Sequence, residues 1–215
     1  EPFKAHPRLS LISLMDHTPG QRQWEDVNQA RTYFTGKKGW SEEKFQQQLA
    51  RSAENQARYA EPHRAFFVQY CQQHGIALAS HDDTTEAHVE QAHAEGASMS
   101  EFPTTVLAVR GGSHSGNVAA AELARLGLLD ILSSDYVPGS LLGAVLRLVQ
   151  DGICSMPAAV AMVTRNPARA TGLHDRGSLE PGLRGDVVQV RLVDLPDGSR
   201  HGVVRGVWRQ GVRVL

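Results

Sequence analysis

Short apolar segments, separated by longer polar ones, organise the first two thirds of the chain. Three of them have the length and the leucine-rich, partly β-branched composition of buried parallel strands. They are LISLM at 11–15, IALAS at 76–80 and LDILSS at 129–134, and a fourth extended segment, ASMSEF, covers 97–102. Helix-forming sequence lies between them, so the pattern predicts alternating strands and helices, as in an α/β barrel.

Residues that start and stop helices bound the predicted elements. Ser41 is a suitable N-cap for a long polar helix, because Glu42 and Glu43 follow it in the first turn. Pro62 suits the first turn of a helix, so it predicts the start of a second helix that ends at Gly75.

The same signals bound the later helices. Thr84 or Thr85 caps a helix that Gly96 ends, Ser140 caps the helix SLLGAVLRLVQ, and Pro157 opens the helix that follows. Each of these helices comes after a predicted strand or another helix, which extends the α/β pattern to about residue 170.

The pattern changes from residue 186 onward. The segments DVVQVRLV and VVRGVWRQGVRVL alternate apolar and polar residues, with turn sequences at PDGS and at Gln210–Gly211. This indicates a small antiparallel β unit. The whole pattern therefore predicts a partial α/β barrel with a β appendage.

Composition is that of an ordinary globular protein. The chain has 215 residues, a net charge of −1 and 41% hydrophobic residues, so it lacks the basic surface of a nucleic-acid-binding protein. It has no apolar run as long as a membrane span, and we expect no signal peptide. Cys71 and Cys154 form no CxxC pair, so we expect buried thiols in a reducing compartment and a cytoplasmic protein without nucleic-acid or membrane partners.

Three metal-type ligands follow the apolar segments: His17, His81 and Asp135. A single histidine at a strand end is more often a core or capping residue, and an aspartate there is often a turn residue. The three together favour a metal site, because the strand ends of a βα-barrel converge on one face. Acidic neighbours, such as Asp16 beside His17, can orient an imidazole toward a metal. Three nitrogen and oxygen ligands with an open position suit hydrolytic zinc, manganese or iron.

The segment RGGSHSGN at 110–117 is the second informative motif. Its three glycines leave backbone N–H groups accessible just before a predicted helix, which is a common arrangement for binding anions. Arg110 and His114 add donors, and Arg22 in PGQRQ is a comparable residue in the loop after His17. The alternative is a tight loop whose glycines serve only its backbone conformation.

These motifs carry a family resemblance over essentially the whole chain. SLMDHTPGQRQ, LASHDDTT, RGGSHSGN and VTRNPARATGL resemble the PhnM family of phosphonate metabolism, within the amidohydrolase superfamily. The resemblance implies an α/β fold in which residues 1–170 are strands five to eight of a (β/α)8 TIM-like barrel. Residues 171–215 would then be the C-terminal part of a composite β-sandwich.

The resemblance also implies an activity. Members of this family hydrolyse α-D-ribose 1-methylphosphonate 5-triphosphate to the 5-phosphate and pyrophosphate, in the carbon–phosphorus lyase pathway. His17, His81 and Asp135 match the ligands after strands five, six and eight, for one or two divalent ions, zinc foremost. Asp135 would also be the general base. The phosphorylated sugar would be bound by Arg22, Arg110, Ser113, His114 and Asn117.

The chain departs from the family pattern in two places. The paired-ligand motif of strand one and the bridging carboxylate of strand four are absent, since the sequence starts just before strand five. Only a few residues join EFPTT to RGGSHSGN, so VLAVRGG resembles a splice. We therefore expect the 215 residues to be portions of a longer protein. A half-barrel would expose apolar strand edges, which another chain, such as the second copy in a homodimer, could cover.

Two other functions remain open from the sequence. The same ligands occur in amidohydrolases that act on cyclic amides or amidines, because chemistry does not follow from fold. A non-catalytic fragment with an incomplete metal centre is the other possibility. Pyrophosphate release, ring opening and metal content distinguish the three.

Overall fold

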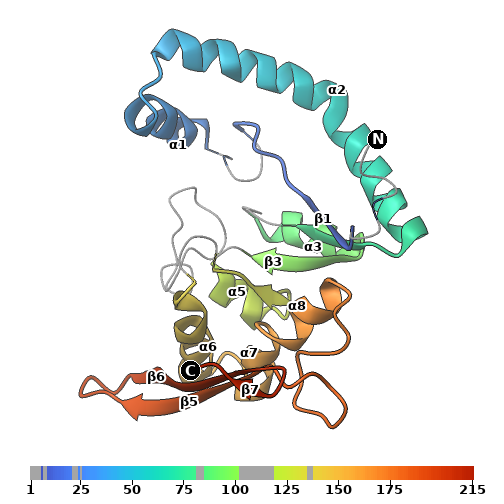
Figure 1. The fold of residues 1–215 in the computed structure, drawn as a ribbon. Coiled ribbons are helices and arrows are strands. Elements are labelled where there is room, and N and C mark those ends of the chain that lie inside the picture. Colours follow the sequence, from blue (N-terminus) through green and yellow to red (C-terminus); the bar gives the residue numbers. More distant parts are fainter. Residues whose placement is uncertain are drawn as a thin grey trace. The chain divides into compact units, whose positions relative to one another are not determined.

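The structure is a computed structural model, and it describes residues 6, 9–20, 24, 26–80, 85–101, 119–134 and 138–215. These residues form two compact units (Figure 1). Unit 1 comprises the described residues up to Glu101 together with Ala119, and unit 2 comprises the described residues from Ala120 onward. Each unit is described by itself.

Unit 1 contains a parallel sheet with helical connections. Strands β1 (Leu11–Leu14), β2 (Ala77–Ser80) and β3 (Ala97–Glu101) are neighbours in chain order. β1 pairs with β2 in register from Leu11 opposite Ala77 to Leu14 opposite Ser80, and β2 pairs in parallel with β3. The predicted strands and their alternation with helices are therefore confirmed in this unit.

Two helical turns and one long helix connect β1 to β2. Helix α1 (Val27–Thr32) begins at Asp26, whose side chain accepts a hydrogen bond from the backbone N–H of Asn28. It continues into the π-helical turn η2 (Tyr33–Lys37). Helix α2 (Glu42–His74) begins at Ser41, whose Oγ accepts from the N–H of Lys44 at 3.2 Å. Ser41 is thus the N-cap that the sequence predicts.

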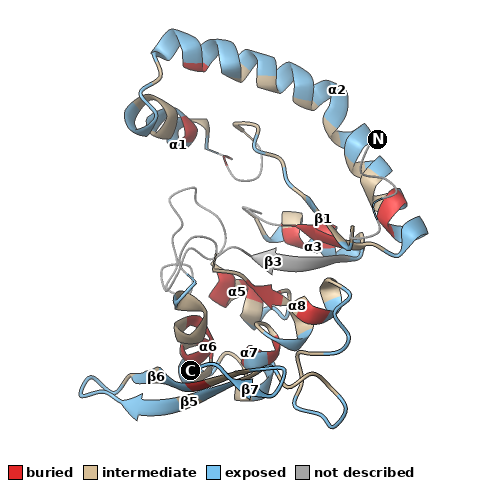
Figure 2. Cartoon of the chain, viewed as in Figure 1, coloured by how far each residue is buried: buried red, intermediate tan, exposed pale blue. Residues whose placement is uncertain are grey.

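The prediction of a separate helix starting at Pro62 is wrong. α2 continues through Pro62 and ends at Gly75, which has a left-handed backbone with φ 63° as predicted for a helix stop. An interior proline removes one backbone hydrogen bond and bends the helix, and α2 curves along its length (Figure 1). The residues around Pro62 are mostly exposed, so water can solvate the carbonyl that loses its donor (Figure 2).

Helix α3 (Glu86–Ala94) connects β2 to β3 and agrees with the predicted bounds. The Thr85 side chain accepts from the N–H of His88, and the chain turns at Gly96 with φ 82°. Val89 and Ala92 of this helix are fully buried. The local cap chemistry thus sets both ends of α3, and its apolar residues provide its packing.

Unit 2 contains four helices, α5 (Ala120–Arg125), α6 (Ser140–Gln150), α7 (Met156–Ala161) and α8 (Arg165–Ala170), and the short strand β4 (Ile131–Leu132). Leu123, Val145 and Leu148 are fully buried and form much of its core. The prediction that Ser140 caps α6 is wrong. Ser140 is the first helical residue, and the N-cap is Gly139, which offers no side-chain hydrogen bond.

The antiparallel β unit is as predicted. β5 (Val187–Asp194) pairs with β6 (Arg200–Arg209), and β6 pairs with β7 (Val212–Arg213). Gln210 and Gly211 form the turn with φ 53° and 77°, as expected for two residues joining a hairpin. A side chain at Gly202 would overlap Leu142 of α6, so this sheet packs closely on the helix within unit 2.

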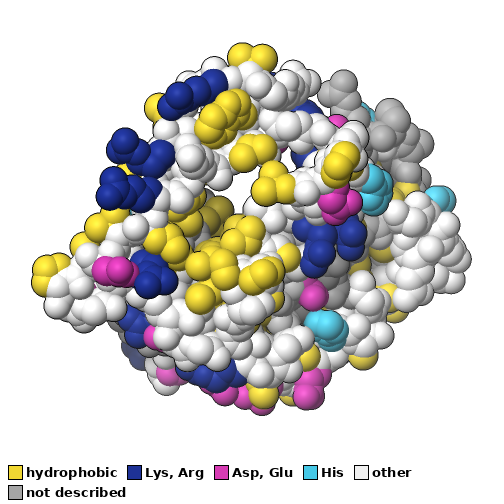
Figure 3. Space-filling model, turned by 90° about the horizontal axis from the view of Figure 1, so that it is seen from below, with side chains coloured by type: hydrophobic (Ala, Val, Ile, Leu, Met, Phe, Trp, Pro, Cys, Tyr) yellow, Lys and Arg dark blue, Asp and Glu magenta, His cyan; other side chains and the backbone are white. Residues whose placement is uncertain are grey.

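Apolar side chains reach the surface in both units. Among the described residues, Phe66, Leu179, Val188 and Val212 are exposed, and apolar and charged side chains are interspersed on the face in Figure 3. No helix in the described part of the chain is long and apolar enough to cross a membrane. Cys71 is buried and Cys154 is half-buried, and burial raises the pKa of both thiols.

Candidate functional site

The candidate site begins at the carboxyl edge of the sheet in unit 1. β1 ends at Leu14, directly opposite Ser80 at the end of β2, and His17 follows β1 by three residues. In parallel α/β folds, active-site residues lie at this edge because successive loops emerge there. The described structure therefore places His17 at the edge that the sequence predicts.

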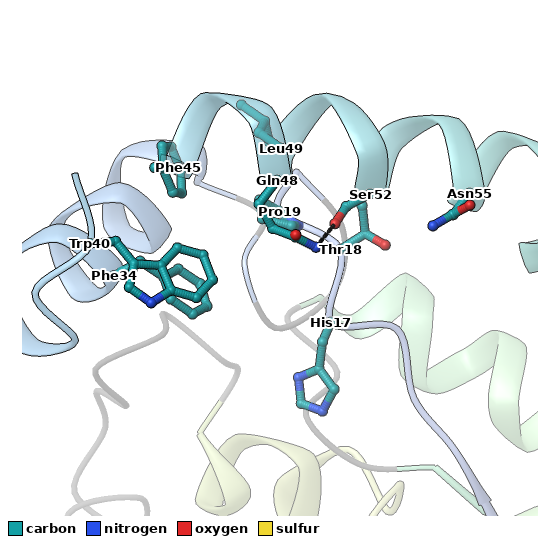
Figure 4. A pocket seen from close by; sticks show the side chains of 10 residues that line it. All are labelled: His17, Thr18, Pro19, Phe34, Trp40, Phe45, Gln48, Leu49, Ser52 and Asn55. Carbon is teal, nitrogen blue, oxygen red and sulfur yellow. Dashed lines mark hydrogen bonds between the residues drawn. The ribbon is translucent and has the colours of Figure 1, made fainter. Parts of the chain in front are cut away.

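A local turn fixes the backbone around His17. Asp16 Oδ1 accepts a hydrogen bond from the backbone N–H of Thr18 at 2.9 Å, which closes a turn of the Asx type. Asp16 thus uses one carboxylate oxygen to shape the loop. The His17 side chain is exposed, and its imidazole points away from α2 (Figure 4).

The other predicted site residues lie outside the described residues. These are the metal ligands His81 and Asp135 and the substrate-binding residues Arg22, Arg110, Ser113, His114 and Asn117. Within the described part of the chain, no three His, Cys, Asp or Glu side chains gather as a metal-binding group. The complete metal site therefore stays a prediction, and the structure describes one of its three candidate ligands, His17.

A cavity of about 400 Å³ lies beside His17 (Figure 4). It was not predicted. Its lining comes from the loop after β1, from η2 and the turn that follows it, and from the first half of α2: His17, Thr18, Pro19, Phe34, Trp40, Phe45, Gln48, Leu49, Ser52 and Asn55. His17 is the one residue among these ten whose side chain can carry a charge. The volume lies in the usual range for small-molecule sites.

One wall of this cavity is aromatic and held by a small core. Trp40 and Phe34 stack with ring centroids 4.7 Å apart, and the backbone N–H of Trp40 donates to the carbonyl of Phe34. Phe34 also packs against Trp24 and Phe45, which are buried. Because this core fixes the rings, the wall exists without a ligand.

The polar part of the lining belongs to α2. Gln48, Ser52 and Asn55 are spaced by four and three residues, which places them on one face of the helix. Gln48 Nε2 donates to Ser52 Oγ at 3.3 Å (Figure 4). All three side chains can both donate and accept hydrogen bonds, and none is charged.

A second cavity of about 680 Å³ adjoins the first, and Thr18 and Asn55 line both. Its charged residues include Asp16, Glu61 and Arg64. Arg64 contacts Glu95 at 2.6 Å, and their side chains are 14% and 23% exposed. This carboxylate neutralises the arginine, so we do not assign an anion site to this cavity.

Comparison with solved structures identifies the fold. The chain resembles an amidohydrolase from Thermotoga maritima MSB8 with a TM-score of 0.53 and 18% identity, over 98% of this chain and 63% of that one. It resembles a D-hydantoinase from Thermus sp. with a TM-score of 0.51 and 14% identity, over 95% and 57% of the two chains. These likenesses place the chain in the class of α/β folds that the two structures share.

The sequence pattern of the Amidohydrolase family matches residues 78–215, and the chain belongs to this family. It is 45% identical to the α-D-ribose 1-methylphosphonate 5-triphosphate diphosphatase of Escherichia coli K12, over 96% of this chain and 59% of that protein. It is 30% identical to an imidazolonepropionase of Deinococcus deserti, over 66% of this chain and 43% of that protein. The chain thus spans about three fifths or less of these relatives.

Proposed function

We propose that the protein containing this chain is a metal-dependent hydrolase that acts on α-D-ribose 1-methylphosphonate 5-triphosphate. Its products are the 5-phosphate and pyrophosphate. The observation that carries this proposal is the 45% identity, over 96% of the chain, to the E. coli protein named for this activity. The exposed His17 at the carboxyl edge of the sheet is consistent with a hydrolytic site there.

The proposed fold is a (β/α)8 barrel in which β1 to β4 are strands five to eight. The parallel register of β1, β2 and β3, and the helices between them, support this assignment. The antiparallel strands β5 to β7 would then belong to the composite β-sandwich.

The proposed metal ligands are His17, His81 and Asp135. The amidohydrolase superfamily generally uses divalent metals, and imidazole and carboxylate ligands suit zinc, manganese or iron. His17 fits this role because its imidazole is exposed and projects from the turn that Asp16 fixes. One or two bound ions would lower the pKa of water and stabilise negative charge on phosphoryl oxygens.

The hydrolysis step combines an exchange of bonds at phosphorus, a proton transfer and the binding of the phosphates. The oxygen of a water molecule forms a bond to the α-phosphorus, while the bond from this phosphorus to the bridging oxygen of pyrophosphate breaks. Asp135 accepts the proton of the attacking water as general base. The phosphoryl oxygens are bound by Arg22, Arg110 and His114, and the substrate is also contacted by Ser113 and Asn117.

Hydrolysis of a cyclic amide is the second candidate. It is favoured by the imidazolonepropionase of D. deserti, whose name refers to an imidazolone ring. Its identity to this chain is lower, and the aligned region is shorter than for the diphosphatase. Ring opening of an imidazolone without pyrophosphate release from the triphosphate would establish this second candidate.

Replacement of Asp135 tests the proposed reaction. In the whole protein, Asp135→Asn is expected to lower kcat for pyrophosphate release by about 10²- to 10⁴-fold, because the general base is lost. The rate is measured by coupled detection of pyrophosphate. Normal turnover of this variant with intact metal content would refute the assignment of Asp135 as base.

Replacement of His17 tests the metal site independently of activity. His17→Ala is expected to reduce the metal content of the purified protein, measured by elemental analysis. His201→Ala is the matched control, since His201 is an exposed histidine on β6. Equal metal content in the two variants would remove His17 from the ligand set.

A further inference from the structure

The cavity beside His17 has a chemical character that the proposed reaction does not yet explain. Apart from His17, its lining combines rings and apolar side chains with hydroxyl and amide groups, and it carries no charge. A phosphate chain needs cationic or N–H-rich partners. This cavity therefore suits an uncharged, hydroxyl-bearing part of a ligand.

The substrate of the proposed function has one such part. Its triphosphate and methylphosphonate groups are negatively charged, and the ribose ring between them is neutral, with C–H surface on its ring and hydroxyl groups at its edge. The wall of Phe34 and Trp40 offers a hydrophobic contact for the ring. From α2, the side chains of Gln48, Ser52 and Asn55 offer hydrogen bonds to the hydroxyl groups.

The geometry of the α2 wall supports this match. Ser52 Oγ already accepts a hydrogen bond from Gln48 Nε2, so the serine hydroxyl hydrogen can donate to a ligand. Gln48 can accept through its amide oxygen, and Asn55 can donate and accept. The aromatic and polar walls belong to η2, the turn after it and α2, all within unit 1, and His17 lies at the edge of the same cavity.

We propose that this cavity is the sugar subsite of the enzyme, binding the ribose ring through Gln48, Ser52 and Asn55 against Phe34 and Trp40. This inference rests on the proposed function, because it takes the ribose from that substrate. It assigns recognition of the sugar to α2 and leaves the phosphates to other residues.

Binding of ribose 5-phosphate to the whole protein tests the subsite, measured by calorimetry. Gln48→Ala and Asn55→Ala are each expected to raise the Kd for ribose 5-phosphate about 5- to 10-fold, because each removes a hydrogen bond to a hydroxyl group. The Kd for pyrophosphate, which lacks a sugar, is expected to stay unchanged. Gln47→Ala is the matched control, since Gln47 is the adjacent glutamine on α2 and does not line the cavity.

Three results would overturn the subsite. The first is wild-type protein that binds pyrophosphate but not ribose 5-phosphate. The second is a Gln48→Ala variant that binds both ligands more weakly by the same factor. The third is wild-type protein that binds ATP more tightly than ribose 5-phosphate, with this preference lost in Trp40→Leu. That result would indicate that the cavity binds a nucleobase. Near-ultraviolet circular dichroism of each variant checks that the aromatic core remains folded.

Failure of the subsite and failure of the proposed function give different results. If the protein binds ribose 5-phosphate through Asn55 but releases no pyrophosphate, the sugar subsite stands and the reaction is wrong. If pyrophosphate is released at rates that Gln48→Ala and Asn55→Ala leave unchanged in both KM and kcat, the reaction stands and the subsite is wrong.

Discussion

An aspartate beside a candidate metal ligand can either orient the histidine or shape the backbone turn, and Asp16 illustrates the second role. The sequence suggests that an acid next to His17 orients the imidazole, whereas the structure shows one carboxylate oxygen of Asp16 accepting from the N–H of Thr18. Short polar side chains often bond to backbone groups close in sequence. Both uses place an aspartate before the histidine, so the sequence alone does not distinguish them.

Asp186 provides a second example of a carboxylate that organises a turn. Its Oδ1 accepts from the backbone N–H of Gln210 at 2.9 Å, and its side chain pairs with Arg184. The Gln210 hydrogen bond, followed by the Arg184 interactions, holds the pKa of Asp186 below its ordinary value of 3.8. The folded state therefore binds this proton less readily than the unfolded chain.

A lowered carboxyl pKa stabilises the fold above the pKa of the unfolded chain, and this stabilisation is lost as pH falls through the folded pKa. Asp186→Asn is therefore expected to lower the unfolding temperature at pH 7, and the difference from wild type should shrink below pH 3.8. Thermal unfolding followed by circular dichroism across this pH range measures the effect. Asp194→Asn is the control, because Asp194 is 77% exposed and its pair with Arg200 should contribute little. A pH-independent difference would contradict the assignment.

At the scale of elements, the sequence predicts most helix ends correctly. Ser41, Thr85, Gly75 and Gly96 all serve as predicted, because capping depends on groups within a few residues. Pro62 is the exception, since a proline in the first turn of a helix and a proline inside a solvated helix look alike in sequence.

The effect of Pro62 on α2 can be measured. Pro62→Ala is expected to stabilise the fold by about 1–3 kcal/mol, because it restores a backbone hydrogen bond in an exposed part of the helix. The greater freedom of alanine in the unfolded chain offsets part of this gain. Urea denaturation gives the free energy of unfolding.

Pro157→Ala is the matched control for that experiment. Pro157 lies in the first turn of α7, where no helical hydrogen bond is lost to a proline, so its replacement should not stabilise the fold. A loss of stability in Pro62→Ala would mean that the contacts of α2 require the bend.

The cavity beside His17 could not be predicted, because its walls come from separate elements. Phe34 and Asn55 are 21 positions apart, and no local pattern relates an aromatic ring in η2 to an amide on α2. The amphipathic spacing of Gln48, Ser52 and Asn55 is visible in the sequence. However, a polar stripe on a helix usually faces water, so this spacing does not indicate a ligand site.

At the scale of the whole molecule, the family assignment predicts a link between metal and stability. A ligand that binds only the folded state stabilises it by RT ln(1 + [L]/Kd), about 2.7 kcal/mol at 100 times the Kd. Treatment of the whole protein with a chelator is therefore expected to lower its unfolding temperature, and zinc should restore it. Calorimetry measures the shift. His17→Ala should remove the response to zinc, whereas His201→Ala should retain it.

At the same scale, the family was predictable from the sequence, whereas the assembly of the metal site was not. The resemblance indicated the amidohydrolase family, which the family match confirms. The strands of unit 1 and the antiparallel β unit are predictable from the sequence pattern, whereas α1 and η2 were not predicted. The convergence of His17, His81 and Asp135 depends on tertiary structure, so no local sequence pattern predicts it, and the metal measurements test it.

The length of α2 has a mechanical consequence. Tyr70 and Cys71 are buried near its carboxyl end, and Asn55 lies about 22 Å away along the axis at 1.5 Å per residue. Phe45 is buried near the other end, so the helix is held on both sides of Asn55. A shift of about 2 Å at Asn55 would exceed the distance range of a good hydrogen bond. Substitutions that loosen the packing of Tyr70 should therefore alter ligand affinity at a distance, without touching the cavity itself.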